Sequence, residues 1–140
     1  MIPAALYGTM HGEVVTVWLN APQQAKVGRV SFWRRESRRM RLHPDTTLVF
    51  ERSDGDLIPA QIGLEFDGGS IPVWAWWLIG SPFTGTYREA AVIHDTLCAQ
   101  KTRPAKDCHR IMFEACRALG VSRVRARLIY IALLIGGSKW

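Results

Sequence analysis

Residues 102–137 decide the fold class, and they read TRPAKDCHRIMFEACRALGVSRVRARLIYIALLIGG. Apolar side chains recur in this segment at intervals of three and four residues, which predicts two helices. Pro104 suits the first turn of the earlier helix, and Gly120 ends it. Ser122 is a good N-cap for the later helix, which runs to the paired glycines at the end of the segment. The connection between the two helices is therefore short.

A third helix is expected before this segment, beginning at Tyr87. Its apolar positions recur at helical spacing and are Ala90, Ala91, His94, Leu97 and Cys98. Residues 66–86 are rich in glycine, proline and tryptophan, and we expect an irregular loop there. The helices therefore follow one another from residue 87 to residue 140.

Residues 1–65 are expected to be mainly β-structure. Val14–Leu19 is β-branched and aromatic, and two further short apolar runs flank the Asp54-Gly55 step, a strong hairpin signal. Strands that come first and helices that come after predict an α+β fold with antiparallel strands, without βαβ alternation. The length of 140 residues and the 48% hydrophobic content suit a single domain over residues 1–140.

The net charge of +6 attracts phosphate-rich partners in general. The arginines concentrate in two places, one holding Arg34, Arg35, Arg38, Arg39 and Arg41 and the other holding Arg123, Arg125 and Arg127. No signature of a nucleic-acid-binding fold accompanies them, so a solvated basic face is favoured and nucleic acid is not expected as a specific partner.

The three cysteines, Cys98, Cys108 and Cys116, are odd in number and fall at apolar helical positions. Free thiols in a reducing compartment are therefore expected. The N-terminus shows no signal-peptide pattern, and the longest apolar run, Leu128–Ile135, is shorter than the ~20 residues that span a bilayer. These features favour synthesis in the cytoplasm.

His94 and Asp95 are the best candidates for chemistry. His94 falls within the apolar stripe of its helix, and Asp95 is about 100° further around it. The imidazole can act as a general base while the carboxylate holds a cation. The alternative is a buried histidine satisfied by one hydrogen bond, and for the pair taken alone this alternative is favoured.

The next helix adds Asp107 and His109, which lie on opposite flanks of its apolar stripe, so only one of them is expected to reach His94. His94, Asp95, His109 and Asp67 together would form a ligand set for zinc or another divalent ion. Asp107 would orient the His94 ring, or alternatively complement the helix dipole. The segment of residues 67–72 also has a purely structural interpretation, as a tight turn.

Three blocks carry a resemblance to a known family: FDGGSIP at 66–72, YREAAVIHD at 87–95 and HRIMFEACRALGV at 109–121. In this order they resemble the bacteriophage domain-of-unknown-function family DUF1353, over about residues 48–140. In that family the block written here as Cys108-His109 commonly reads Ala-Asp. This chain therefore has a histidine where the family usually carries an acid.

The helix pair alone is also similar to secretory phospholipases of the A-two type. This second resemblance implies that His94 activates water, that Asp95 and carbonyls of the Gly80–Gly85 loop bind calcium, and that Asp107 orients His94. The ion would stabilise the oxyanion of an ester hydrolysis. The disulfides typical of those enzymes are absent from this chain.

Two strongly apolar segments have open interpretations. Trp74, Trp76 and Trp77 either cover the sheet or anchor the domain at an interface. The helix that contains Leu128–Ile135 is apolar nearly all round, so it must be buried or meet a partner. Its basic start also suits a membrane surface, but a core helix is the favoured interpretation.

Two functions follow from these observations. The first is a structural or accessory protein of a bacteriophage virion, in the tail, the baseplate or the head-tail region. It would be made in the host cytoplasm, join other virion proteins in an oligomeric assembly, and carry a His-Asp site that stabilises the fold or holds a divalent ion. The alternative is a metal-dependent, phospholipase-like ester hydrolase that uses calcium or zinc during phage entry or lysis.

Overall fold

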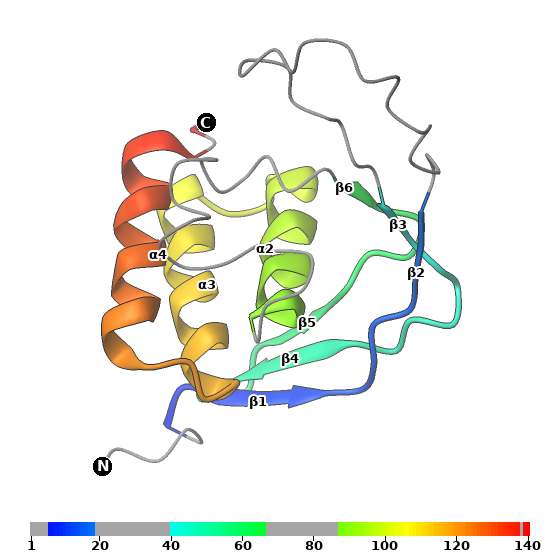
Figure 1. Ribbon diagram of the computed structural model, residues 1–140, viewed down its shortest axis with the longest axis horizontal. Coiled ribbons are helices and arrows are strands. Elements are labelled where there is room, and N and C mark those ends of the chain that lie inside the picture. Colours follow the sequence, from blue (N-terminus) through cyan, green and yellow to red (C-terminus); the bar gives the residue numbers. More distant parts are fainter. Residues whose placement is uncertain (1–5, 19–39, 67–86, 138) are drawn as a thin grey trace, which may run out of the picture.

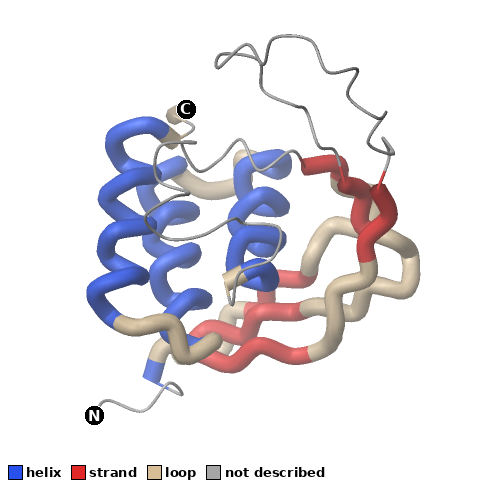
Figure 2. Tube along the Cα trace, viewed as in Figure 1, coloured by secondary structure: helices blue, strands red, loops and turns tan. Residues whose placement is uncertain are grey.

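The computed structural model describes residues 6–18, 40–66, 87–137 and 139–140. Over these ranges the protein has the expected α+β fold, with antiparallel strands in the N-terminal half and three helices in the C-terminal half (Figure 1). The strands form two sheets, and the helices stand side by side next to them (Figure 2).

The first sheet has the order β1-β4-β5, with β1 at Gly8–His11, β4 at Val49–Arg52 and β5 at Leu57–Pro59. The turn between β4 and β5 is the predicted hairpin. Gly55 adopts a φ of 88°, which glycine reaches without strain, and the Arg52 amide donates to the Asp56 carbonyl at 2.9 Å. The prediction from the Asp-Gly step is therefore confirmed.

The second sheet has the order β2-β3-β6, with β2 at Thr16–Trp18, β3 at Met40–Leu42 and β6 at Glu65–Phe66. Phe66 pairs with Met40 in this sheet, so the irregular loop begins later than the sequence suggested. The expectation for Phe66 was wrong because pairing with a distant strand, rather than local composition, determines its conformation. Residues 67–86, the remainder of that loop, lie outside the described residues.

The helices are α2 at Arg88–Gln100, α3 at Ala105–Ala118 and α4 at Arg123–Gly136. Their ends confirm the sequence signals. The Ser122 hydroxyl accepts from the Arg125 amide at 3.3 Å, and Gly120 follows α3 with a φ of 82°. Within the helical layer α3 lies between α2 and α4, and it also contacts β1 (Figure 1).

One core joins the sheets to the helices. Phe50 and Leu42 contribute from the two sheets, and the helices add mainly aliphatic side chains such as Ile93, Met112 and Ile129. The three cysteines are free, with Cys108 and Cys116 buried and Cys98 half-buried. The free thiols agree with the sequence prediction.

The helix α4 is not a central helix. It buries Ala126, Ile129, Ala132 and Leu133, while its other faces reach the surface. Val124 is 70% exposed, and the isoleucines at 131 and 135 are 48% and 65% exposed. The expectation of a core helix is therefore wrong, because α4 lies at the outside of the helical layer against α3 (Figure 2).

Among the described residues, no helix combines the length and the apolar character that a membrane crossing requires.

Candidate functional site

Two imidazoles meet between α2 and α3. The Nε2 atom of His94 lies 2.9 Å from Nδ1 of His109, and the ring centroids are 5.1 Å apart with a tilt of 35° between the planes. Only 1% of His94 and 2% of His109 is exposed. Of the two candidates on α3, His109 is therefore the residue that reaches His94.

This contact is a hydrogen bond in which one ring nitrogen donates and the other accepts. An imidazole with one proton has one donor nitrogen and one acceptor nitrogen, so a single proton between the rings satisfies both facing atoms. The pair therefore links α2 to α3 through a buried hydrogen bond.

Cys98 is a neighbour of the pair that the sequence reasoning did not assign to the site. Its Sγ lies 3.6 Å from Nε2 and 3.8 Å from Nδ1 of His94. The signal was present, since residues four apart share one face of a helix. Burial raises the pKa of the Cys98 thiol to about 12, and the nearby Asp95 and Cys108 add to this shift. The thiol is therefore protonated at neutral pH and is a poor nucleophile.

Asp95 lies near His94. Its Oδ1 atom is 3.8 Å from His94 Nδ1, and 12% of its side chain is exposed. This distance exceeds that of a hydrogen bond, so the contact is an electrostatic one. His94 thus has an imidazole at Nε2 and a carboxylate near Nδ1.

Asp107 occupies a different position from the one that the orienting role requires. It is exposed in the first turn of α3, where a carboxylate complements the helix dipole. It lies two positions before His109, which corresponds to about 200° around a helix. Since His109 faces α2, the structural alternative for Asp107 has the better support.

The predicted metal ligands are only partly within the described structure. Asp67 and the Gly80–Gly85 loop lie outside it, as do Trp74, Trp76 and Trp77. The described part of the chain contains no group of three or more His, Cys, Asp or Glu side chains arranged to hold a metal ion. In the His94–His109 pair, Nε2 of His94 and Nδ1 of His109 bond to each other rather than to an ion.

Comparison with known protein families identifies a family that the chain matches. The model of the family described as "Protein of unknown function (DUF1353)" matches residues 43–133, which is more than half of the chain. The chain belongs to this family. The match begins just before β4 and includes α2, α3 and most of α4, so it contains the His94–His109 pair.

The curated relatives are uncharacterized. The protein y4jT of Sinorhizobium fredii is 41% identical over 91 residues, which cover 65% of this chain and 27% of that protein. The protein y4iH of the same organism is 36% identical over 74 residues, which cover 53% of this chain and 31% of that protein. The chain thus spans less than a third of either relative. No solved structure matches the chain.

Proposed function

We propose that this protein is a structural or accessory component of a bacteriophage virion, in the tail, the baseplate or the head-tail region, and that it acts by binding other virion proteins. The resemblance of three sequence blocks to a bacteriophage family supports the viral context. The observation that carries the binding role is the exposed apolar side of α4. A protein that uses side chains to join an assembly must present such a surface.

The exposed side of α4 is a continuous row, which we call the outer stripe: Val124, Leu128, Ile131 and Ile135. These residues are spaced by four, three and four positions, so they share one face of the helix. Leu128 is partly buried, and the other three are exposed. Leu128 packs against the edge of the core, but core packing does not account for the three exposed members, which lie away from the residues that α4 buries.

The geometry at His94 supports a role in folding over a role in catalysis. The imidazole is buried, its Nε2 atom is bonded to His109, and the adjacent Cys98 thiol is protonated. A general base needs an accessible nitrogen next to its substrate or water. The hydrolase alternative stays a prediction, because it depends on Asp67 and the Gly80–Gly85 loop, which lie outside the described residues.

The test compares two substitutions in a bacteriophage genome that carries the coding sequence. Ile131→Glu places a charge in the outer stripe, and Ile62→Glu places the same charge at an exposed apolar position far from α4 in the sequence. We expect the Ile131→Glu protein to fold but to be lost from purified particles, whereas the Ile62→Glu protein is incorporated at the wild-type stoichiometry. Quantitative mass spectrometry of the particles measures both. Incorporation of both variants would contradict the proposal.

The hydrolase alternative is tested separately at His94 and Asp95. If His94→Gln particles assemble with the normal protein content but lose infectivity or lipid hydrolysis, a purely structural role is inadequate. A thermal-shift titration with calcium or zinc reports ion binding directly, because a ligand of the native state raises the melting temperature. An ion site at Asp95 would show such a shift, and Asp95→Asn would abolish it.

A further inference from the structure

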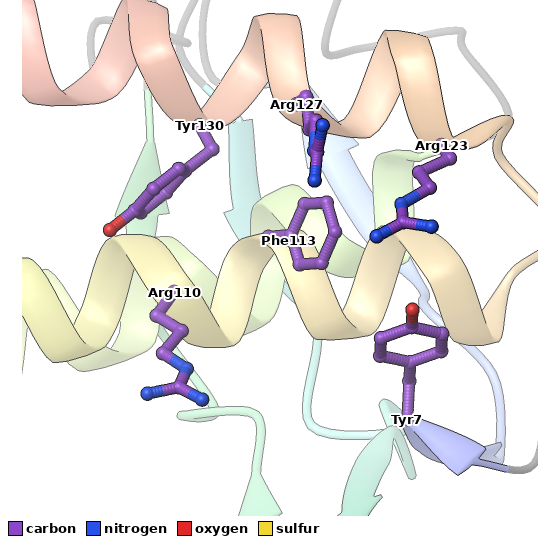
Figure 3. Close-up of a pocket in the computed structure, with 6 residues that line it drawn as sticks. All are labelled: Tyr7, Arg110, Phe113, Arg123, Arg127 and Tyr130. Carbon is purple, nitrogen blue, oxygen red and sulfur yellow. The ribbon is translucent and has the colours of Figure 1, made fainter.

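A surface hollow of about 320 Å³ lies between α3 and α4. Figure 3 shows its six lining side chains, which come from both helices and from the residue before β1: Tyr7, Arg110, Phe113, Arg123, Arg127 and Tyr130. Three of them carry guanidinium groups and three carry aromatic rings, and none of the six is acidic. The hollow is separate from the His94–His109 pair, which is buried on the side of α3 that faces α2.

The three aromatic rings of the hollow, which we call its aromatic floor, belong to Tyr7, Phe113 and Tyr130. Their contacts with one another and with Arg117 hold them in place. The Phe113 ring packs edge-on against Tyr7, with centroids 5.9 Å apart and an angle of 84°, and it lies 6.3 Å from the Tyr130 ring. The guanidinium group of Arg117 lies 5.4 Å from the centroid of the Tyr7 ring and donates to the Val121 carbonyl at 2.7 Å. These contacts fix the rings before any ligand arrives.

The guanidinium groups of the hollow are available to an external anion. Arg123 and Arg127 form no ion pair with any residue in the described ranges, and α4 itself contains no acidic residue. Arg110 has only a long contact of 3.7 Å with Glu114. That carboxylate is already held by Arg52, which donates to it at 2.8 and 3.0 Å. The hollow therefore has a net positive charge that the described residues do not neutralise.

We propose that this hollow binds a nucleotide unit, with a phosphate on the guanidinium groups and a base against the aromatic floor. Arginine binds phosphate through parallel hydrogen bonds, and aromatic side chains stack on exposed bases. A volume of about 320 Å³ is at the small end for ligand pockets, which suits one nucleotide rather than a long ligand. A free nucleotide and a single strand with unpaired bases both offer this chemistry, whereas a duplex keeps its bases stacked inside.

The experiment uses the full chain and measures fluorescence anisotropy of a short labelled oligothymidylate. Adenosine monophosphate, inorganic pyrophosphate and a duplex of the same length serve as competitors. We expect adenosine monophosphate to compete better than pyrophosphate, although pyrophosphate carries more charge, because only the nucleotide also contacts the aromatic floor. If adenosine monophosphate and the oligonucleotide bind equally well, the ligand is a free nucleotide. If the oligonucleotide binds much more tightly, the ligand is a single strand.

Two arginine variants separate the hollow from general charge. Arg127→Gln removes a guanidinium group that lines the hollow, and Arg125→Gln removes one from the same helix that does not line it. We expect Arg127→Gln to weaken nucleotide binding by about tenfold, the effect of one lost charge-assisted hydrogen bond. Arg125→Gln should change it by less than about twofold, since only long-range charge is lost. Equal weakening by both variants would overturn the proposal.

Phe113→Leu tests the aromatic floor while keeping an apolar side chain at this half-buried position. We expect this variant to weaken the binding of adenosine monophosphate by about tenfold, the scale of one stacking contact, and to leave competition by pyrophosphate unchanged. The unchanged pyrophosphate arm also shows that the variant has folded and kept its arginines in place. Pyrophosphate or duplex competition equal to that of the nucleotide, or no binding of any probe, would overturn the proposal.

Discussion

The contact between His94 and His109 predicts a specific pattern of stabilities when the two residues are replaced singly and together. Leucine is close to histidine in volume and has no polar atom, so His94→Leu leaves a buried nitrogen of His109 without its partner at 2.9 Å, and His109→Leu does the reverse. A buried polar group that loses its partner costs about 1–3 kcal/mol. The double variant removes both polar groups and with them this cost.

We therefore expect each single variant to lose about 2 kcal/mol of unfolding free energy from the broken hydrogen bond, and the double variant to lose less than the sum of the two. Because the double variant removes this cost altogether, the expected interaction energy in the double-mutant cycle is about 4 kcal/mol, twice the cost of one buried nitrogen without its partner. Both residues have further neighbours, such as Asp95 near His94. These contribute equally to a single variant and to the double variant, so they cancel in the cycle.

Urea unfolding followed by circular dichroism measures all four proteins at neutral pH. Thr96→Val combined with His109→Leu provides the matched control. Thr96 is also buried on α2, but its hydroxyl accepts a hydrogen bond from the Gln61 amide at 3.1 Å, on the strand side. This control pair should be additive within about 0.5 kcal/mol. Additivity of the histidine pair to the same degree would refute the hydrogen bond as the link between α2 and α3.

Three further predictions concern other parts of the chain. Arg103 donates to Asp56 and holds the pKa of this carboxyl below its usual value. Asp56→Asn should therefore lower the free energy of unfolding by about 1 kcal/mol at pH 6. In acid unfolding curves the difference from wild type should shrink as the pH falls below about 4. Cys98, with a pKa of about 12, should react with iodoacetamide about a hundredfold more slowly in the native protein than in urea. Gly12→Ala should lower the free energy of unfolding in urea by about 2 kcal/mol, because φ is 81° and the new Cβ would lie 2.3 Å from a main-chain oxygen. Gly63→Ala, at a similar φ but in open space, should lower it by less.

The helical half of the fold was predictable because its signals are local. Each of α3 and α4 has a start signal, a periodic stripe and a terminating glycine within one segment; the start signal is Pro104 for α3 and the capping Ser122 for α4. The strands β1, β3 and β6 have two to four residues each, which is too short for a visible alternation. They form because a partner strand lies beside them; Gly8, for example, pairs with Arg52 across the first sheet.

The candidate site was predictable to a similar extent. Helical spacing brought His94 and the α3 acid and histidine into one neighbourhood, but the rotation of α3 about its axis decided that His109 faces inward and Asp107 outward. The surface hollow had only a partial sequence signal, the arginine cluster that contains Arg123 and Arg127. Tyr7 reaches Phe113 only because β1 pairs with β4 and packs against α3, and no spacing rule connects residues so far apart.

The two sites share α3 but use different side chains of it, and this makes their roles separable. His109 is buried toward α2, whereas its neighbour Arg110 has its guanidinium group at the surface hollow. Neither imidazole lines the surface hollow, so a ligand there makes its contacts without the pair. Loss of the pair should therefore lower the unfolding free energy and leave the nucleotide affinity unchanged. Arg127→Gln should instead weaken nucleotide binding and leave the unfolding free energy unchanged. If loss of His94 also weakened nucleotide binding, the position of α3 relative to α2 would affect the geometry of the surface hollow.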